Sequence, residues 1–151
     1  MGGAMLQYDF EESVGYWVIS TAHEIVRAMN HELAAHGITF RQWEVLVWLS
    51  IHGEQPQSVL AERMQIEPPT MVGVLDRMER DGWIERAVVE GDRRKKRIRV
   101  TPKVEPVWAK MVACAHKVRS TATASLSPAD MATLRDTLAT VRANLESGQT
   151  S

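Results

Sequence analysis

Apolar residues recur every three or four positions along most of this chain, which is the spacing of amphipathic α-helices. The first such run extends from Asp9 to about His36 and stops before Gly37, a residue type that commonly ends helices. We therefore expect a long first helix over residues 9–36 and a protein that is mainly helical.

Two shorter helices are expected next. One covers about residues 40–52, because Thr39 and Gln42 have the spacing of a capping box in front of an apolar face. Residues 54–57 then form a turn-like segment rich in polar residues. The other helix is about two turns long; it is marked by Leu60, Ala61 and Met64, which are spaced for one helix face, and it is interrupted by residues 65–69.

The fourth expected helix begins at two prolines, Pro68 and Pro69. Proline is excluded from helix interiors but is tolerated in a first turn, where its missing N–H group would have no helical partner. The helix continues to residue 80, and its apolar stripe consists of Met71, Val74, Leu75 and Met78. That stripe leaves Thr70, Gly73 and Arg77 together on the opposite face. Two short helices joined by a tight turn form a helix-turn-helix pattern.

A β-hairpin is expected after this helix, which ends at Asp81-Gly82. Apolar and polar residues alternate over residues 84–88, and residues 90–93 form the turn. In the return strand, Ile98 and Val100 lie on one face while Arg97 and Arg99 lie on the other. One face of the hairpin is therefore expected to pack and the other to present cations.

Two long helices complete the chain. Thr101-Pro102 is expected to cap and open a helix that extends from about Lys103 to Ala124. Ser127 and Asp130 form a second capping pattern before a last helix. The apolar residues of this helix alternate at spacings of three and four: Met131, Leu134, Leu138, Val141 and Leu145. Such a stripe requires a partner surface, and the expected fold class is mainly α with a small β-hairpin.

Charge is distributed unevenly along the chain. The 151 residues have a net charge of −1, yet residues 86–103 contain eight basic and two acidic side chains. This segment therefore has a local charge of +6, while the rest of the chain has −7. Positive charge concentrated on one hairpin indicates a binding surface for a polyanion.

Length and composition exclude several other classes of protein. The chain has the size of one compact domain, and no apolar run approaches the ~18 residues of a membrane span. The N-terminus lacks the pattern of a secretory signal, and the single Cys114 has no intrachain disulfide partner, so we expect a cytoplasmic protein. Residues 1–8 are expected to be a flexible leader, and residues 147–151 a flexible tail.

The motifs in the second half of the chain resemble those of a known family. A helix-turn-helix pattern is followed by Gly82-Trp-Ile-Glu-Arg86 and by a hairpin with Asp92-Arg-Arg94 and a closing Arg99-Val-Thr101. Over about residues 10–146 the chain resembles the MarR family of winged-helix transcription regulators, most closely its SlyA-like branch. This resemblance implies a homodimer that binds a palindromic operator in double-stranded DNA, without catalytic activity or a cofactor.

The resemblance also implies a division of the chain. Residues 37–102 would form the winged helix-turn-helix, and residues 9–36 and 103–146 would form a helical dimerisation region with interleaved terminal helices. The residues expected at the dimer interface are Phe10, Val14, Trp17, Leu134, Leu138, Val141 and Leu145.

For DNA binding, the resemblance implies that the fourth helix enters the major groove and that Arg94 inserts into the minor groove. Asp92 would hold the Arg94 guanidinium in place, and neighbouring cations would meet phosphates. Gly73 stands where SlyA-like relatives carry an arginine, so base readout is expected to differ from theirs. The expected DNA-binding residues are Ser58, Pro68, Pro69, Thr70, Gly73, Arg77, Asp92, Arg93, Arg94, Lys95 and Lys96.

Other sites are weighed against simpler interpretations. In the MarR family small aromatic or amphipathic ligands bind between the dimerisation helices and the DNA-binding lobe, and His23 and Trp43 are our candidates for such a pocket. His31 and His36 superficially resemble a zinc motif, but five positions separate them by about 140° on a helix, so no metal site is expected. Cys114 is interpreted as a buried small apolar residue in preference to a redox switch.

One alternative function remains open at this point. A winged-helix module that binds an acidic protein partner would carry the same basic hairpin. Salt-dependent binding to duplex DNA with a sequence preference distinguishes the two possibilities. The operator, the ligand and whether the protein represses or activates transcription do not follow from the residues.

Overall fold

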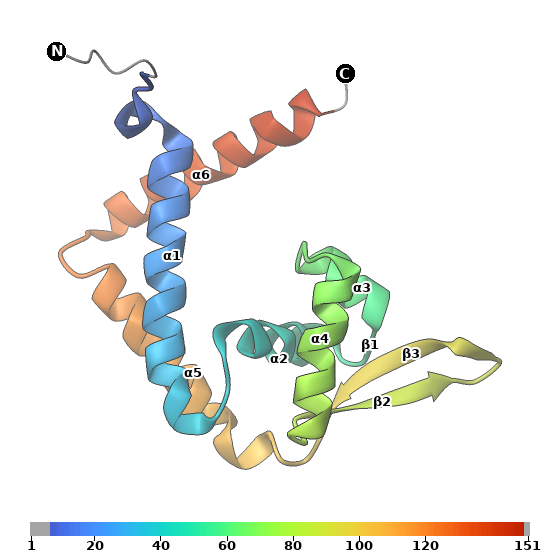
Figure 1. The fold of residues 1–151 in the computed structure, drawn as a ribbon. Coiled ribbons are helices and arrows are strands. Elements are labelled where there is room, and N and C mark those ends of the chain that lie inside the picture. Colours follow the sequence, from blue (N-terminus) through green and yellow to red (C-terminus); the bar gives the residue numbers. More distant parts are fainter. Residues whose placement is uncertain (1–6, 150–151) are drawn as a thin grey trace, which may run out of the picture. The chain divides into compact units, whose positions relative to one another are not determined.

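The computed structural model describes residues 7–149, except for the side chains of Arg93 and Arg94. These residues form six α-helices, two short 3-10 helices and a three-stranded antiparallel sheet. The chain divides into two compact units, residues 1–115 and 116–151. In the first unit, α2 (Phe40–His52) lies between α1 (Val14–Leu33) and the pair formed by α3 (Gln57–Arg63) and α4 (Pro68–Arg80) (Figure 1). A β-hairpin projects from this pair on the side away from α2. The expected fold class, mainly α with a small hairpin, is confirmed.

The first helix is shorter than predicted and is flanked by two 3-10 helices. These are η1 (Phe10–Glu12) and η2 (Ala34–His36), on either side of α1 (Val14–Leu33). Ser13 has an extended backbone, with φ −77° and ψ 124°, which separates η1 from α1. The prediction of one continuous helix from residue 9 to 36 is therefore wrong. Gly37 ends the segment with φ 70°, as expected for a helix terminus.

Helix α2 (Phe40–His52) has the boundaries that its capping pattern predicted. The Gln42 backbone N–H donates to Thr39 Oγ1 at 3.2 Å, and the Thr39 backbone N–H donates to Gln42 Oε1 at 3.1 Å. These two bonds satisfy donors that the helix itself leaves unpaired. Val45 and Leu46 are fully buried, so this helix forms the centre of the core.

The helix-turn-helix consists of α3 (Gln57–Arg63) and α4 (Pro68–Arg80). Pro68 and Pro69 occupy the first turn of α4, as predicted. The four residues of the predicted stripe, Met71, Val74, Leu75 and Met78, are all buried. At the end of α4, the Trp83 N–H donates to the Met78 carbonyl and the Gly82 N–H to the Glu79 carbonyl. This Schellman arrangement turns the chain directly into the hairpin.

The sheet has the strand order β1-β3-β2 and contains one strand that the sequence did not indicate. Strands β2 (Ile84–Val89) and β3 (Asp92–Val100) form the predicted hairpin. Its turn contains only residues 90 and 91, with φ 89° at Gly91, so the predicted four-residue turn is too long. Strand β1 (Gln55–Pro56) lies in the segment predicted as a turn and pairs with residues 97 and 98 of β3.

The hairpin packs through a narrower face than predicted. Ile98 is fully buried, but Val100 on the same strand is 42% exposed. Helix α5 (Glu105–Ala122) begins later than predicted, so Thr101 is not its N-cap. The Thr101 hydroxyl donates to the Gly82 carbonyl at 2.5 Å. The bond to Gly82 instead ties the end of β3 to the end of α4.

The second unit contains the end of α5 and helix α6 (Pro128–Gly148). The predicted capping box is present, with the Asp130 N–H donating to Ser127 Oγ at 3.0 Å and the Ser127 N–H to Asp130 Oδ2 at 2.8 Å. Because α6 continues to Gly148, the predicted flexible tail starts too early. Most of the predicted leader, residues 1–6, and the last two residues lie outside the described part. No helix in the described part is both long enough and apolar enough to cross a membrane.

Candidate nucleic-acid interface

The outer face of α4 is narrow and has no side chain at its centre. Thr70 and Arg77 are exposed and Gly73 is half-buried, so the predicted outward face is present. Arg77 Nη1 lies 3.6 Å from the position that a Cβ atom on Gly73 would occupy. The guanidinium thus lies back along the helix over the glycine. A partner that meets this face therefore meets the Arg77 guanidinium beside the glycine, on a helix of a size that fits a major groove about 12 Å wide.

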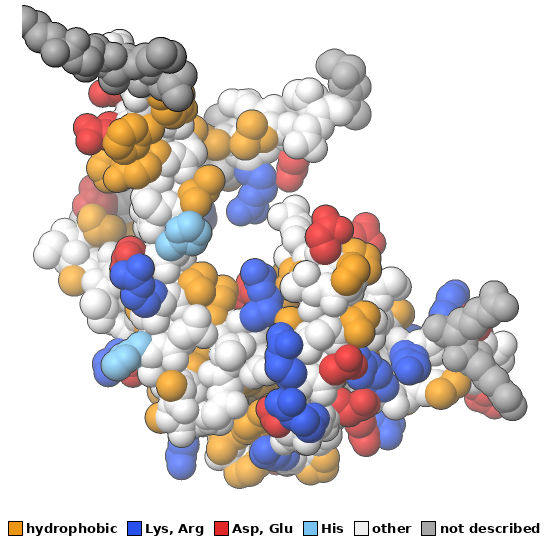
Figure 2. Space-filling model, viewed as in Figure 1, with side chains coloured by type: hydrophobic (Ala, Val, Ile, Leu, Met, Phe, Trp, Pro, Cys, Tyr) orange, Lys and Arg blue, Asp and Glu red, His pale blue; other side chains and the backbone are white. Residues whose placement is uncertain are grey.

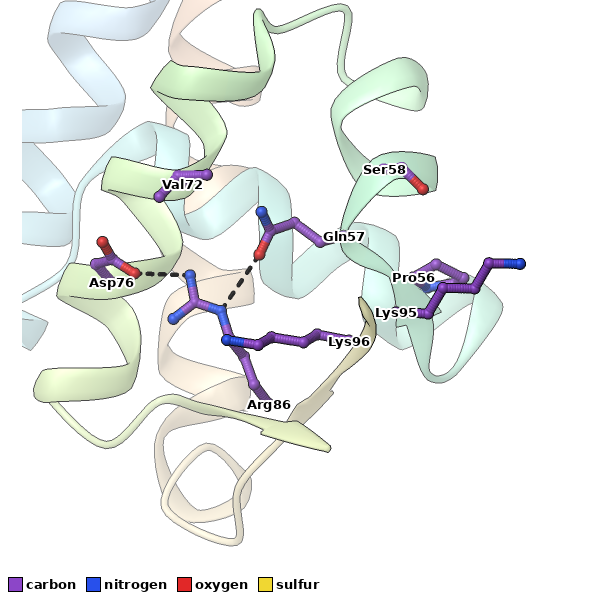
Figure 3. Close-up of a pocket in the computed structure, with 8 residues that line it drawn as sticks. All are labelled: Pro56, Gln57, Ser58, Val72, Asp76, Arg86, Lys95 and Lys96. Atoms are coloured by element: carbon purple, nitrogen blue, oxygen red, sulfur yellow. Dashed lines mark hydrogen bonds and ion pairs between the residues drawn. The ribbon is translucent and has the colours of Figure 1, made fainter. Parts of the chain in front are cut away.

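Predicted contact residues from α3, α4 and the hairpin surround two neighbouring cavities. Ser58 and Pro68 line a cavity of about 320 Å³ between α3 and α4. Ser58 also lines a second cavity, of about 440 Å³, together with Lys95 and Lys96 of β3. In Figure 3, Lys96 extends across this second cavity towards Arg86, while Lys95 and Ser58 point away from Arg86. The fold therefore gathers residues that are almost 40 positions apart in the sequence.

The predicted tip of the hairpin is only partly described. Asp92 is half-buried at the start of β3, and Lys95 and Lys96 are exposed. The side chains of Arg93 and Arg94 lie outside the described part, so the predicted minor-groove contact of Arg94 and its support by Asp92 remain predictions.

Many cations of the basic segment are already paired within the lobe. Arg86 is bound to two carboxylates of α4. Arg99 Nε lies 2.5 Å from Glu85 Oε1, and Arg97 Nη2 donates to the Glu54 carbonyl at 3.0 Å. The Glu54 carboxylate lies near both of these guanidinium groups, at 3.6 and 3.8 Å. The face with Arg97 and Arg99 therefore presents cations as expected, with side chains 42% and 47% exposed, but both are paired with carboxylates of the lobe.

A fourth cation of the segment, Lys103, is also held by the lobe. Its ammonium group donates to the Asp81 carbonyl at 2.6 Å and lies 4.2 Å from the centre of the Trp83 ring. Figure 2 accordingly shows acidic side chains among the basic ones on this face of the lobe. Lys95 and Lys96 make no ion pair with any described side chain, so they are the described cations of the hairpin that remain available to an anion.

One residue of this region was recognised in the sequence as a charge and as part of a motif, without a role of its own. Arg86 binds Gln57, Asp76 and Glu79 and lines the cavity of Figure 3. The sequence contained a weak signal for this arrangement, because Asp76 and Glu79 are three positions apart and share one side of the predicted helix. Nothing in the sequence paired that side with Arg86.

The two ligand candidates differ in their exposure. Trp43 is only 8% exposed and stacks on Trp108, with ring centres 5.2 Å apart. His23 is exposed on α1, and neither residue lines the cavities found among the described residues. Trp43 is therefore a core residue, and a ligand-binding role for either residue remains a prediction.

The simpler interpretation of Cys114 is confirmed. Its thiol is buried, and Sγ lies 3.6 Å from the Glu32 carbonyl. Among the described residues, no group of three or more potential metal ligands occurs.

Most of the residues predicted at a dimer interface are exposed apolar side chains, whereas Val141 is half-buried. In the first unit, Phe10 is 47% and Trp17 58% exposed, and Figure 2 shows hydrophobic side chains gathered over η1 and the start of α1. In the second unit, Leu134, Leu138 and Leu145 are exposed along α6. Exposed apolar clusters of this kind commonly mark protein interfaces.

Comparisons with known proteins agree with this arrangement. The sequence model of the MarR family matches residues 38–96. The solved transcriptional regulator PA3341 is 30% identical, with a TM-score of 0.78 over 89% of this chain and 99% of its own. A probable transcriptional regulator from Pseudomonas aeruginosa is 25% identical, with a TM-score of 0.78 over 87% and 98%. A mutant MarR from E. coli complexed with operator DNA shares the fold at 21% identity, with a TM-score of 0.81 over 89% and 99%.

Proposed function

Because the chain belongs to the MarR family, we propose that this transcriptional regulator binds a specific sequence in double-stranded DNA as a homodimer. The observation that carries the proposal is the outer face of α4, where exposed Thr70 and Arg77 flank Gly73 and the Arg77 guanidinium lies beside the glycine. A helix face of this composition fits a major groove, where an arginine recognises guanine and a threonine reaches base edges or phosphate.

The neighbouring elements would supply sequence-independent contacts. Lys95 and Lys96 are exposed on the hairpin, and Ser58 is exposed at the start of α3. These side chains are suited to phosphate oxygens, which fix the register of a protein on DNA. Arg94 would enter the minor groove beyond them. The E. coli relative of similar fold was solved in complex with operator DNA, which supports DNA binding by this fold.

Dimerisation would follow from the exposed apolar residues. Phe10, Val14 and Trp17 on η1 and α1, and the stripe of α6, would be buried against a second copy of the chain. Two α4 helices related by a two-fold axis would then meet successive major grooves. The operator would be a palindrome with half-sites about 10 base pairs apart, centre to centre.

A small aromatic or amphipathic ligand is proposed to lower operator occupancy. This part rests on the family resemblance, with His23 as the remaining exposed candidate contact. Titration of the protein–operator complex with salicylate and with a lipophilic cation tests it. If neither ligand released the DNA at concentrations up to millimolar, modulation by these ligand types would be contradicted.

The DNA-binding proposal is tested by selection from a pool of random duplexes, followed by affinity measurements at several salt concentrations. Arg77→Ala should change the preferred sequence, because it removes a base contact. Lys96→Ala should weaken all duplexes alike and reduce the slope of log K against log salt by about 0.9 per half-site. An identical consensus and ranking for both variants would contradict this division of roles. If the protein bound no duplex but did bind an acidic protein, the protein-interaction alternative would be favoured.

A further inference from the structure

Arg86 is the centre of a network that joins three elements of the lobe. Its side chain projects from β2 and is 10% exposed. Nη2 lies 2.8 Å from Asp76 Oδ1 and Nη1 lies 3.1 Å from Glu79 Oε1, both on α4. Nε donates to Gln57 Oε1, in the first turn of α3, at 3.3 Å. Figure 3 shows the guanidinium between Gln57 and Asp76.

The geometry of this network depends on a planar guanidinium. Three nitrogens of one group bind three side chains in different directions, and the Arg86 backbone N–H also donates to Glu79 Oε2 at 3.2 Å. A lysine has one ammonium group at the end of a flexible stem, so it cannot reproduce this fork. Arg86 therefore restrains α3, α4 and β2 relative to one another in a way that its charge alone would not.

The two acidic partners of Arg86 place negative charge beside the proposed DNA-binding surface. The side chains of Asp76 and Glu79 are 61% and 45% exposed, and Asp76 lines the same cavity as Lys95 and Lys96. Two carboxylates beside a surface for DNA would repel phosphates. Arg86 compensates part of this charge while it is itself shielded from solvent.

We propose that Arg86 is a positioning residue of the DNA-binding surface, which holds the outer face of α4 and the lysines of β3 at the separation that lets both meet DNA together. Arg86 does not itself contact DNA. The inference rests on the proposed function, and it assigns a role to a residue that acts through Gln57, Asp76 and Glu79. Preorganisation of this kind raises affinity because the free protein already has the geometry of the complex.

Asp76→Asn is a test in which simple electrostatics and the positioning role predict opposite changes in DNA affinity. Removal of a negative charge next to a DNA-binding surface should tighten binding through simple electrostatics. Under the positioning proposal, the same change weakens the interaction of Arg86 with α4 and should therefore weaken operator binding several-fold. Glu67→Gln is the matched control, since Glu67 is exposed at the N-terminus of α4 and makes no ion pair with a described residue. It should tighten binding or leave it unchanged.

Arg86→Lys is the second variant, because it retains the positive charge but loses the fork. We expect roughly tenfold weaker operator binding, equivalent to about 1.4 kcal/mol, with an unchanged salt slope. Faster amide hydrogen exchange in residues 57–63 and 84–89 should accompany it. If Arg86 were a phosphate contact, Arg86→Lys would retain most of the affinity and Arg86→Gln would reduce the salt slope.

The outcomes separate this inference from the function on which it rests. Failure of the unmodified protein to bind any duplex would overturn the proposed function. Duplex binding by the unmodified protein, with Asp76→Asn binding as tightly as Glu67→Gln, would overturn only the role of Arg86. If Arg86→Lys does not fold, Asp76→Asn and Gln57→Ala decide the question, and normal affinity in both would reject the proposal.

Discussion

Gly73→Ala should stabilise the protein and weaken its binding to DNA. Gly73 lies in the interior of α4 with an ordinary helical backbone, since its φ is not positive. In such a position alanine is favoured over glycine by about 1 kcal/mol. The added Cβ would meet Arg77 Nη1 at 3.6 Å, which is normal van der Waals contact with the end of a flexible side chain. No steric cost therefore offsets the gain in helix propensity.

The expected stabilisation is measurable. For a chain of this length, about 1 kcal/mol corresponds to an increase in Tm of roughly 2–4 °C. Thermal and urea unfolding should be compared at one protein concentration, because dimerisation makes apparent stability depend on concentration.

The same methyl group should interfere with DNA. It would stand at the centre of the face that we propose to enter the major groove, and it would occupy space over which the Arg77 guanidinium now lies. We expect operator affinity to fall roughly tenfold, or about 1.4 kcal/mol, when measured by fluorescence anisotropy. Ser50→Ala is the control, since Ser50 is exposed on α2 of the same lobe and bonds only to the Val47 carbonyl. Its DNA affinity should be normal.

Two results would refute this reasoning. A lower Tm for Gly73→Ala would mean that the glycine has a conformational role in α4 that its helical backbone does not reveal. A higher Tm with unchanged operator affinity would show that DNA does not approach α4 closely at Gly73.

Four further predictions concern the hairpin, the dimer and stability. Arg94→Ala should weaken operator binding by ~1–3 kcal/mol in a folded dimer, and normal affinity in an anisotropy titration would remove Arg94 from the interface. Leu138→Asp should yield a monomeric or unfolded species in sedimentation, whereas a stable monomer of the unmodified protein at micromolar concentration would contradict the dimer. Thr39→Ala should lower the free energy of unfolding in urea by about 1 kcal/mol, and an unchanged midpoint would show that the capping box contributes little. Burial raises the pKa of Glu44 despite the nearby Arg41, so the contribution of Glu44 to stability should be lost as pH rises through its folded pKa. Glu44→Gln should remove that part of the pH dependence. If the free energies of unfolding of the two proteins, measured in urea at several pH values, changed equally with pH, this assignment would be contradicted.

Local interactions explain why much of the fold was predictable. The capping bonds of α2 and α6 join residues three positions apart, Thr39 with Gln42 and Ser127 with Asp130. The glycine ends of helices and the proline start of α4 likewise depend on the backbone preferences of single residues. Such features are encoded within a few residues, so they can be recognised before the rest of the chain is placed.

The outer face of α4 was predictable for a related reason. Helical periodicity assigns every residue of an amphipathic helix to a side, and burial of Met71 and Leu75 leaves Thr70 and Arg77 outside. Periodicity did not reveal that the guanidinium lies over Gly73, because that position depends on the side-chain conformation.

The pairing of the basic side chains with carboxylates was the part that the sequence alone did not predict. A count of charges finds the basic segment, but pairing is decided by carboxylates that the fold brings from elsewhere. Glu54 lies 43 positions before Arg97 in the sequence, and its carboxylate pairs with this arginine. Glu85 lies on the neighbouring strand and pairs with Arg99. Partial compensation of this kind depends on distances of a few ångströms, which no one-dimensional pattern contains.

The sequence by itself thus determined the order and approximate extent of the helices, the caps of α2 and α6, the hairpin and the exposed face of α4, because these follow from hydrogen bonds and side-chain periodicity over a few residues. Only the tertiary structure decided the pairing of β1 with β3, the bond from Thr101 to Gly82 and the three partners of Arg86. Each of these contacts joins residues from different segments of the chain. Their formation depends on how the buried faces of those segments pack, and this packing also sets which of the basic side chains remain available to DNA.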